Sequence, residues 1–292
     1  MNATRLDEDF TSSVHVYEPH RKGLPRLRPY FRALWERRQF AAEMSRASMR
    51  AANTNTVFGQ IWLVLNPLLL ACVYFTLVFI LRGGNAGPDF FVHLVGGLFA
   101  FFYFSGALQT GASSVVGGGK LLLNMSFPRL LLPLAALRTA FFRFLPTLLV
   151  YFVLHFTFGQ RLHWAMLLAP YFLLMLTLFG AGMGMIFATI QVYFRDAASF
   201  LPYMVRIWLY MSPVLWFPEV GIGRLESKFG DVGEIMYANP LFSILGGWGE
   251  TLVRGEVPPL GMWIGAAAWA IPVLVIGAIF FMSREREFVV RL

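Results

Sequence analysis

Six long, continuously apolar runs constrain this chain more than any other feature of its sequence. A helix needs about 20 mostly apolar residues to cross a bilayer, and each run reaches that length. Because the runs do not alternate apolar and polar residues, they favour helices over the strands of a membrane barrel. The sequence therefore predicts an all-α, polytopic membrane protein with six transmembrane helices. We place these at about 58–81, 91–115, 131–157, 163–193, 198–217 and 260–282.

The composition agrees with a single membrane domain that carries polar tails. Hydrophobic residues make up 57% of the chain, above the roughly 45–50% of soluble domains. The one cysteine, Cys72, lies in an apolar run and has no partner for an internal disulfide. No apolar stretch follows Met1, so we expect no cleavable signal peptide, and the first apolar run stays in the membrane.

The distribution of basic residues predicts the orientation. Six crossings place both termini on one side, and sixteen Lys and Arg residues lie on that side against five on the other. Loops rich in Lys and Arg remain cytosolic. We therefore expect both termini in the cytosol and the protein in the plasma (inner) membrane.

Three regions follow from these patterns. Residues 1–20 are acidic and lack apolar periodicity, and Pro25 and Pro29 follow them, which predicts a disordered cytosolic tail over residues 1–28. Residues 29–57 predict an amphipathic helix at the membrane interface, with packing against cytosolic protein as the alternative. Residues 58–292 form the transmembrane domain.

Two connecting segments of that domain stand out. The cytosolic loop 117–129 joins the second and third spans. The outer segment 218–256 is net negative and contains an apolar run that is too short and too broken for a confident span. A re-entrant outer segment is expected, and its broken backbone must be buried in protein or line a cavity.

Several kinds of chemistry are disfavoured. No Asp or Glu occupies the centre of a predicted span, which argues against proton-driven transport. Gly119-Lys120 is followed by Leu121, so the chain lacks the Ser or Thr of a phosphate-binding loop. No Cys/His cluster suggests a metal, no Ser/His/Asp set has motif support, and the outer acids are scattered along the sequence. We therefore expect no metal and no cofactor in this chain.

Three arginines lie inside apolar spans: Arg138, Arg143 and Arg206. Each costs roughly 2.5–3.5 kcal/mol at a span centre, and no mid-span acid compensates. They are expected to face a water-filled passage, to reach the membrane surface, or to bind an anion. Arg138 and Arg143 are separated by roughly 140° around a helix, so they do not share one narrow face.

Aromatic residues make up 16% of the chain and several fall in mid-span. Aromatic faces stack on the C–H faces of sugar rings, so a ring-lined passage can guide a sliding glycan; the alternative is helix packing or lipid contact. The candidates are Phe102, Tyr103, Tyr203, Trp208 and Tyr210.

Five short motifs are distributed along the chain: Gly59–Trp62 with Leu65–Leu68, Phe127–Arg129 with Leu132–Pro133, Phe194–Asp196, Trp208–Pro213, and Asn239–Leu241. They occur in the order found in ABC-transporter permeases that export polysaccharide, O-antigen and teichoic acid. The chain resembles this family along nearly its whole length after residue 30. The stretch before the first span, SRASMRAANTNT, is less basic than is typical of the family.

The resemblance implies a half-transporter. Two copies of the chain would form a channel at their interface, and two ABC ATPase subunits, which carry ATP and Mg, would bind beneath. Their cycle would move a polyprenyl-pyrophosphate-linked polysaccharide outward through the membrane lipids, and no nucleic acid would be involved. The chain looks most like actinobacterial exporters of lipid-linked galactan.

The resemblance also implies roles for individual residues. Asn239 and Pro240 belong to the outer gate. The residues that couple to the ATPase would be Lys120, Leu121, Asn124, Phe127 and Arg129. Candidates for the substrate pyrophosphate are Arg46, Arg50, Arg138 and Arg143, with Lys120 and Arg129 also near the cytosolic entrance.

Other functions remain open at this stage. A permease of the same architecture could export a drug or a small lipid. A membrane glycosyltransferase acting on polyprenyl carriers is a second alternative, although the cytosolic loops beside the membrane offer only Asp196 as an acid. A purely structural subunit fits poorly with three arginines inside the spans.

Overall fold

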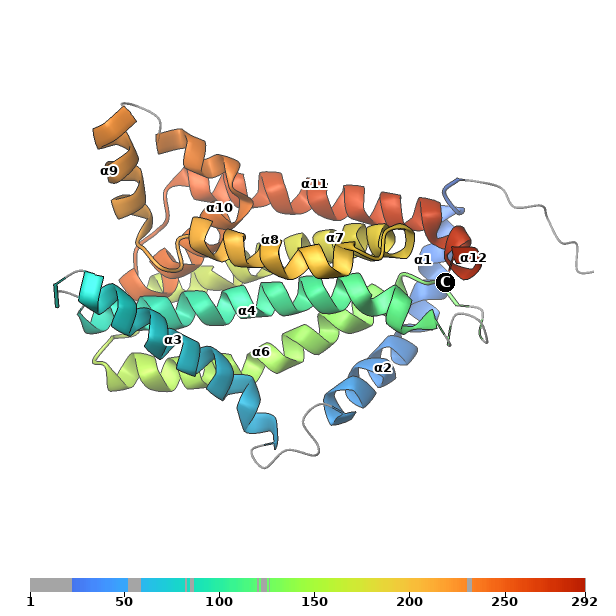
Figure 1. Cartoon of the computed structure of the whole chain (residues 1–292), viewed down its shortest axis with the longest axis horizontal. Coiled ribbons are helices and arrows are strands. Elements are labelled where there is room, and N and C mark those ends of the chain that lie inside the picture. Colours follow the sequence, from blue (N-terminus) through green and yellow to red (C-terminus); the bar gives the residue numbers. More distant parts are fainter. Residues whose placement is uncertain are drawn as a thin grey trace, which may run out of the picture.

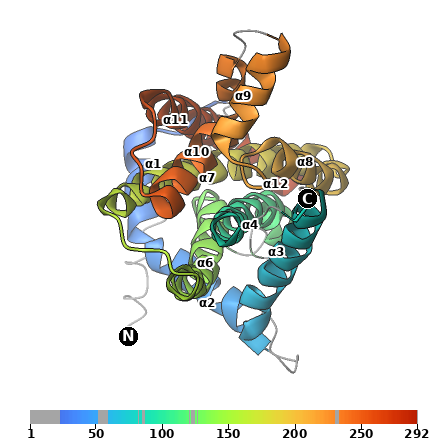
Figure 2. The ribbon, with the colours of Figure 1, turned by 90° about the vertical axis from the view of Figure 1, so that its left-hand side faces the viewer.

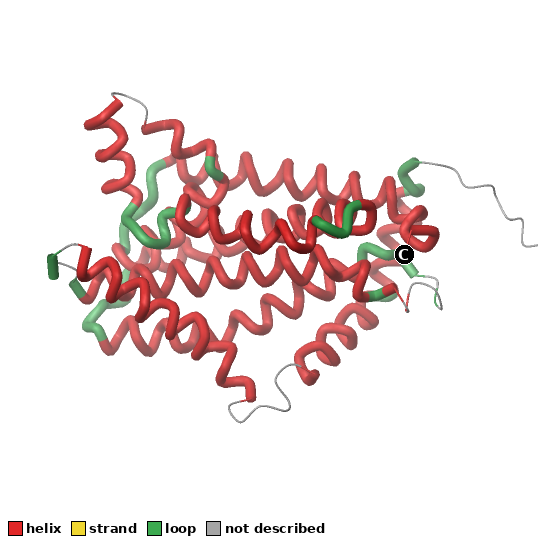
Figure 3. Tube along the Cα trace, viewed as in Figure 1, coloured by secondary structure: helices red, strands yellow, loops and turns green. Residues whose placement is uncertain are grey.

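The structure is a computed structural model, and it describes residues 23–51, 59–81, 83–84, 87–119, 121, 125, 127–229 and 233–291. Within these residues the regular elements are helices and no strand occurs (Figure 3). The expected all-α class is therefore confirmed. The predicted tail falls largely outside the described residues.

Five helices in the described part of the chain are long and apolar enough to cross a membrane. They correspond to the first four and the last of the expected spans. The long helices are α3 (Trp62–Leu81), α4 (Pro88–Gly117), α6 (Leu131–Thr157), α7 (Ala169–Tyr193, preceded by the 3₁₀ turn η2, Trp164–Leu168) and α11 (Leu260–Arg284).

The expected fifth span, 198–217, corresponds to α8 (Ala197–Met211), which has only 15 residues. Ser212 is extended, as expected for a residue that precedes proline, and the helix ends there. Figure 1 shows that α8 runs alongside α7 and returns the chain to the end of the bundle where the following helices lie. Helix length therefore does not confirm the count of six spans.

Helix α4 forms the centre of the bundle. Of its most apolar window, 83% is buried, against 11% for α3, and Figure 2 shows the other long helices around it. By contrast, α3 and α8 each leave one apolar face uncovered. The exposed side chains are Val73, Leu77 and Ile80 on α3, and Phe200, Tyr203, Ile207 and Tyr210 on α8.

The expected interface helix is divided in two. Helix α1 (Leu27–Glu36) begins two residues earlier than predicted, and α2 (Arg38–Ala51) follows a break at Arg37; residues 52–58 lie outside the described residues. Helix α1 buries Tyr30, while α2 packs on α6, where Thr139 Oγ1 donates to Ser45 Oγ at 3.0 Å. A position at the membrane interface stays a prediction for both helices.

The outer segment contains α9 (Pro218–Phe229), η3 (Gly233–Ala238), α10 (Pro240–Gly249) and a π-helical turn, η4 (Glu250–Arg254). Helix α9 projects from the end of the bundle (Figure 1). Every residue of α10 is buried, so the expected burial of this broken backbone is confirmed. Its re-entrant character stays a prediction.

The chain ends in η5 (Glu285–Glu287) and α12 (Phe288–Arg291). Both lie at the same end of the bundle as α1 (Figure 1), as expected for an even number of crossings. We refer to this as the terminal end, and to the end with α9 as the opposite end. Which of them is cytosolic stays a prediction.

Candidate functional site: a basic cleft beside the central helix

Two adjoining cavities lie on one side of the bundle. The larger, of about 650 Å³, lies between α3, α4 and α6, and the smaller, of about 620 Å³, lies between α2, α3 and α6. Leu63 and Arg143 line both. We call the two together the basic cleft, with Arg143 at the junction of its two chambers.

The larger chamber has mostly apolar walls with a few polar groups, the combination typical of ligand sites. Aromatic rings come from all three helices, and one asparagine and three threonines lie among them. Trp62 and Asn66 belong to a sequence motif but were given no role in a site, and the threonines were missed, because single Thr residues in apolar runs carry no motif signal. The aromatic and polar lining residues are Trp62, Phe99, Phe102, Tyr103 and Phe144, with Asn66, Thr110, Thr139 and Thr147.

The charge of the cleft comes from arginine. Arg46 and Arg50 of α2 line the smaller chamber together with Arg143 of α6. Among the described residues, neither chamber has an Asp or Glu in its lining, although Arg46 pairs with Glu43 at 2.5 Å. The Nε of Arg143 is buried and has no hydrogen-bond partner among the described residues. A buried donor without a partner is costly, so an anionic ligand would satisfy both its charge and its hydrogen-bonding capacity.

Arg138 occupies a different position from Arg143. Its guanidinium lies over the ring of Phe142, 5.0 Å from the ring centroid, and it lines neither chamber. The prediction that these two arginines do not share one face is confirmed. Of the four arginines proposed to bind the substrate pyrophosphate, Arg46, Arg50 and Arg143 therefore lie together in the cleft, and Arg138 lies apart from them.

The five candidate aromatics do not converge within one chain. Phe102 and Tyr103 line the larger chamber, and the Tyr103 ring stacks on Phe144 with 5.1 Å between centroids. Tyr203 and Tyr210 are exposed on α8. A passage lined by all five stays a prediction.

Trp208 is tied to the expected outer gate. Its Nε1 donates to Asn239 Oδ1 at 3.2 Å, and Asn239 Nδ2 donates to the carbonyl of Met211 at 2.9 Å. The same Oδ1 accepts from Leu241 N at the start of α10. Asn239 therefore caps α10 while it joins that helix to the end of α8, with Pro240 in the first turn.

The expected coupling residues are only partly described, since Lys120 and Asn124 lie outside the described residues. Leu121 is exposed. Phe127 packs on Phe40 of α2, with 5.0 Å between ring centroids. Arg129 is half-buried, and burial lowers the pKa of its guanidinium while Glu285 and Tyr30 act in the opposite direction. Docking of an ATPase on these residues stays a prediction.

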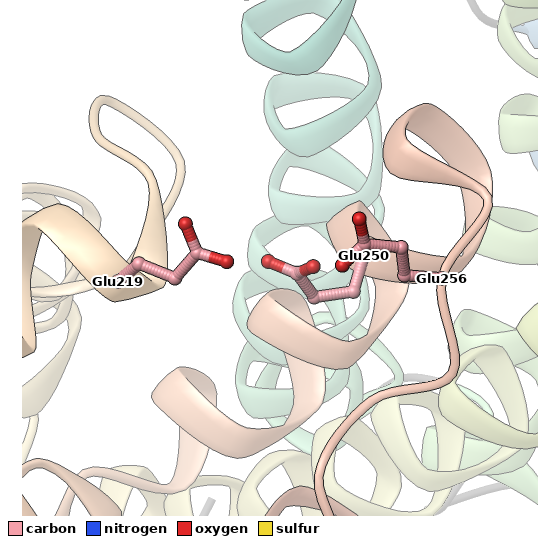
Figure 4. Close-up of side chains that lie close together, drawn as sticks. All are labelled: Glu219, Glu250 and Glu256. Atoms are coloured by element: carbon pink, nitrogen blue, oxygen red, sulfur yellow. The ribbon is translucent and has the colours of Figure 1, made fainter.

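Three outer acids that look scattered in the sequence lie together in the structure. Carboxylate oxygens of Glu219, Glu250 and Glu256 all lie within 4.8 Å of one another (Figure 4). Oxygen ligands of this kind suit Ca²⁺, but the guanidinium of Arg254 already pairs with Glu219 and lies 3.5 Å from Glu250. The cluster joins the base of α9 to η4, so these three acids are scattered along the sequence but lie together in space.

Glu250 makes stability depend on pH. Burial raises the pKa of Glu250 from 4.5 to about 7; Arg254 opposes the rise, and Glu219 and Glu256 add to it. As the pH rises from 4.5 to 7, the unfolded chain releases this proton while the folded chain retains it, so the folded state loses stability across this window.

We therefore expect Glu250→Gln to remove part of the pH dependence of unfolding between pH 4.5 and 7. A tenfold change in proton affinity corresponds to about 1.4 kcal/mol, so the effect is at most about 3 kcal/mol. Unfolding midpoints in detergent across this range test it. Glu226→Gln, an exposed acid of α9 outside the cluster, is the control that should leave the profile unchanged. Equal profiles for the native chain and Glu250→Gln would contradict the assignment.

Fold and cleft together define the class: a multi-pass, all-helical membrane protein with a cationic, ring-lined cleft in its apolar bundle. No protein-family model matches the chain. An O-antigen export system permease protein RfbA of Myxococcus xanthus is 26% identical over 258 residues, 88% of this chain and 96% of the relative. Another of the same name, from Klebsiella pneumoniae, is 28% identical over 203 residues, 69% of this chain and 75% of the relative.

A further RfbA permease of K. pneumoniae is 27% identical over 205 residues, covering 70% of this chain and 76% of the relative. All three relatives bear the name of a polysaccharide-export permease. These similarities confirm the resemblance to the polysaccharide-export permeases that the five sequence motifs predicted.

Proposed function

We propose that this chain is the membrane-spanning subunit of an ATP-driven exporter that moves a polyprenyl-pyrophosphate-linked cell-envelope polysaccharide outward across the plasma membrane. The observation that carries the proposal is the similarity to an O-antigen export permease along 88% of this chain and 96% of the relative. A likeness of that extent spans most of both chains and is not confined to one motif.

The basic cleft supports the choice of substrate. A pyrophosphate carries negative charge that would complement Arg50 and Arg143, and also Arg46, which already pairs with Glu43. Arginine forks bind phosphate oxygens in pairs. The rings of Phe102 and Tyr103 lie beyond Arg143 in the larger chamber, where a sugar next to the pyrophosphate could stack. A galactan is the finer proposal; the cleft fits any glycan with a pyrophosphate-linked lipid.

The proposed transporter also contains a second copy of this chain and two ATPase subunits. A second copy of the chain would cover the exposed apolar faces of α3 and α8, which lie side by side: the hydroxyl oxygens of Tyr74 and Tyr210 are 3.3 Å apart. Tyr203 and Tyr210 would then face the passage between the copies. Two ATPase subunits, which hold ATP and Mg, would dock at the loop 117–129, with both termini in the cytosol.

The proposal is tested by co-purification with the ATPase encoded beside this chain. Lys120→Glu is expected to weaken the association at least about tenfold, since a reversed charge at a contact replaces attraction by repulsion. Arg195→Glu is the control, because Arg195 is an exposed arginine of another turn at the terminal end. Lys120 is the better choice than Arg129, whose side chain lies beside Glu285.

The outcomes separate the alternatives. Loss of the ATPase from Lys120→Glu alone supports docking at the loop. Equal association of both variants would place docking elsewhere. If no ATPase associates with the native chain, the proposed function is wrong, and a carrier or a membrane enzyme becomes the better hypothesis.

A further inference from the structure

Three segments that are distant in the sequence meet at one buried point of the terminal end. The hydroxyl of Tyr30 in α1 donates to Glu285 Oε2, just after α11, at 2.7 Å. Both residues are buried, with 9% and 7% of their surface exposed. Arg129, the last residue of the loop 117–129, lies close enough to interact electrostatically with both.

Tyr30 and Glu285 lie beside the start of α6. There the backbone N–H groups of Leu131 and Leu132 donate to the carbonyls of Pro128 and Arg129 at 3.1 and 3.0 Å, so the chain already turns into the helix at these residues. The Glu285 carboxyl lies close to Arg129, and the Tyr30 hydroxyl lies close to Leu130. The hydrogen-bonded pair therefore lies against the point where the loop 117–129 enters α6.

Apolar side chains enclose this pair. Leu130 and Leu132 belong to the same buried cluster as Tyr30, Phe281 and Phe288, and the last two rings are 5.1 Å apart between centroids. Hydrogen bonds are stronger where water is excluded, and losing one there leaves a buried group unpaired. The start of α6 is thus held at once by the N-terminal and the C-terminal helices.

We infer that Tyr30 and Glu285 are positioning residues that hold the exit of the loop 117–129 against α1 and α11, so that a displacement of the loop moves both helices with α6. That these contacts transmit motion from an ATPase to the membrane helices rests on the proposed function above. That they hold residues 127–132 in place is independent of that function. Packed interfaces move between discrete arrangements and do not deform continuously. A loop clamped at its exit therefore passes on a displacement that a loose loop would absorb.

Hydrogen–deuterium exchange of the full chain in nanodiscs tests the clamp without any ATPase. Tyr30→Phe removes one hydroxyl, and we expect amides in residues 127–132 to exchange about tenfold faster, as for the loss of one hydrogen bond to a charged group. Tyr193→Phe is the matched control: it removes a hydroxyl that donates to Glu287 at 2.6 Å, on the same C-terminal segment. Glu285→Gln is the second variant and should act on residues 127–132 as Tyr30→Phe does.

The second readout is the amount of glycan exported per ATP hydrolysed by the complex. Tyr30→Phe is expected to retain the ATPase and its basal hydrolysis while this ratio falls several-fold, whereas Tyr193→Phe keeps it. Equal exchange of residues 127–132 in both Tyr→Phe variants would overturn the inference, whatever the ATPase does. If amides 127–132 exchange faster in Tyr30→Phe while the glycan exported per ATP stays unchanged, these contacts do not transmit ATPase motion. Failure of the native chain to bind an ATPase counts against the proposed function alone.

Discussion

Export of the lipid-linked polysaccharide is expected to fall at least about tenfold when Arg143 is replaced by alanine, since a hydrogen bond to a charged group contributes about 1.5–3 kcal/mol. Arg143 is the arginine that lines both chambers of the basic cleft. Its removal takes the charge from the junction where the pyrophosphate and the sugar would meet. Folding should not suffer, because the buried guanidinium Nε has no partner among the described residues to leave behind.

The measurement is surface glycan in cells that carry the variant, with the amount of membrane-inserted protein determined in parallel. Arg138→Ala is the matched control, since it removes the same side chain from the same helix but outside the cleft. Arg143→Lys should restore part of the activity, because lysine keeps the charge and loses the planar fork. Equal export by the Arg138→Ala and Arg143→Ala variants would remove Arg143 from the site.

Replacing Gly182 by alanine is expected to destabilise the fold by about 3 kcal/mol, the upper end of the usual range for overpacking. Helices α7 and α11 touch here through their backbones: a Cβ on Gly182 would lie 2.5 Å from the carbonyl oxygen of Val273. On α11, the residue that faces Gly182 is also a glycine, Gly277. A Cβ on Gly277 would clash with the carbonyl oxygen of Gly182. Backbone atoms cannot move aside as a flexible side chain can, so the two helices must separate.

Thermal unfolding in detergent measures this effect. Gly184→Ala is the control on the same helix, because a Cβ there would meet Gly111 Cα at an ordinary 3.5 Å. That variant should be neutral or slightly stabilising, since alanine favours helix by about 1 kcal/mol over glycine. Similar unfolding temperatures for both variants would show that the close approach of α7 and α11 does not limit packing.

Much of the fold could be predicted because a bilayer leaves few choices. An apolar run of about 20 residues must satisfy its own backbone hydrogen bonds, which makes it a helix wherever it lies. The run 131–157 was predicted to the residue as α6 for this reason. The run 198–217 was less predictable, because its apolar character continues past Ser212 while the following proline ends the helix at Met211.

The site could be predicted only in part. The sequence identified arginines in apolar surroundings as unusual, and separated Arg138 from Arg143 by helical geometry. It could not indicate which of the two faces a cavity, since that depends on how α2 and α3 pack against α6. It also gave no sign of Tyr30 with Glu285, because residues 255 positions apart share no local pattern.

By itself, the sequence determined that the chain is a helical membrane protein, where its five long apolar helices lie, and which family of permeases it resembles. All of these depend on local composition and on short motifs. Only the tertiary structure decided that Arg46, Arg50 and Arg143 share one cleft, that Glu219, Glu250 and Glu256 gather around Arg254, and that Tyr30 and Glu285 pair beside the start of α6. Each is a contact between separate helices, and the packing of helices sets such contacts while their sequence periodicity does not.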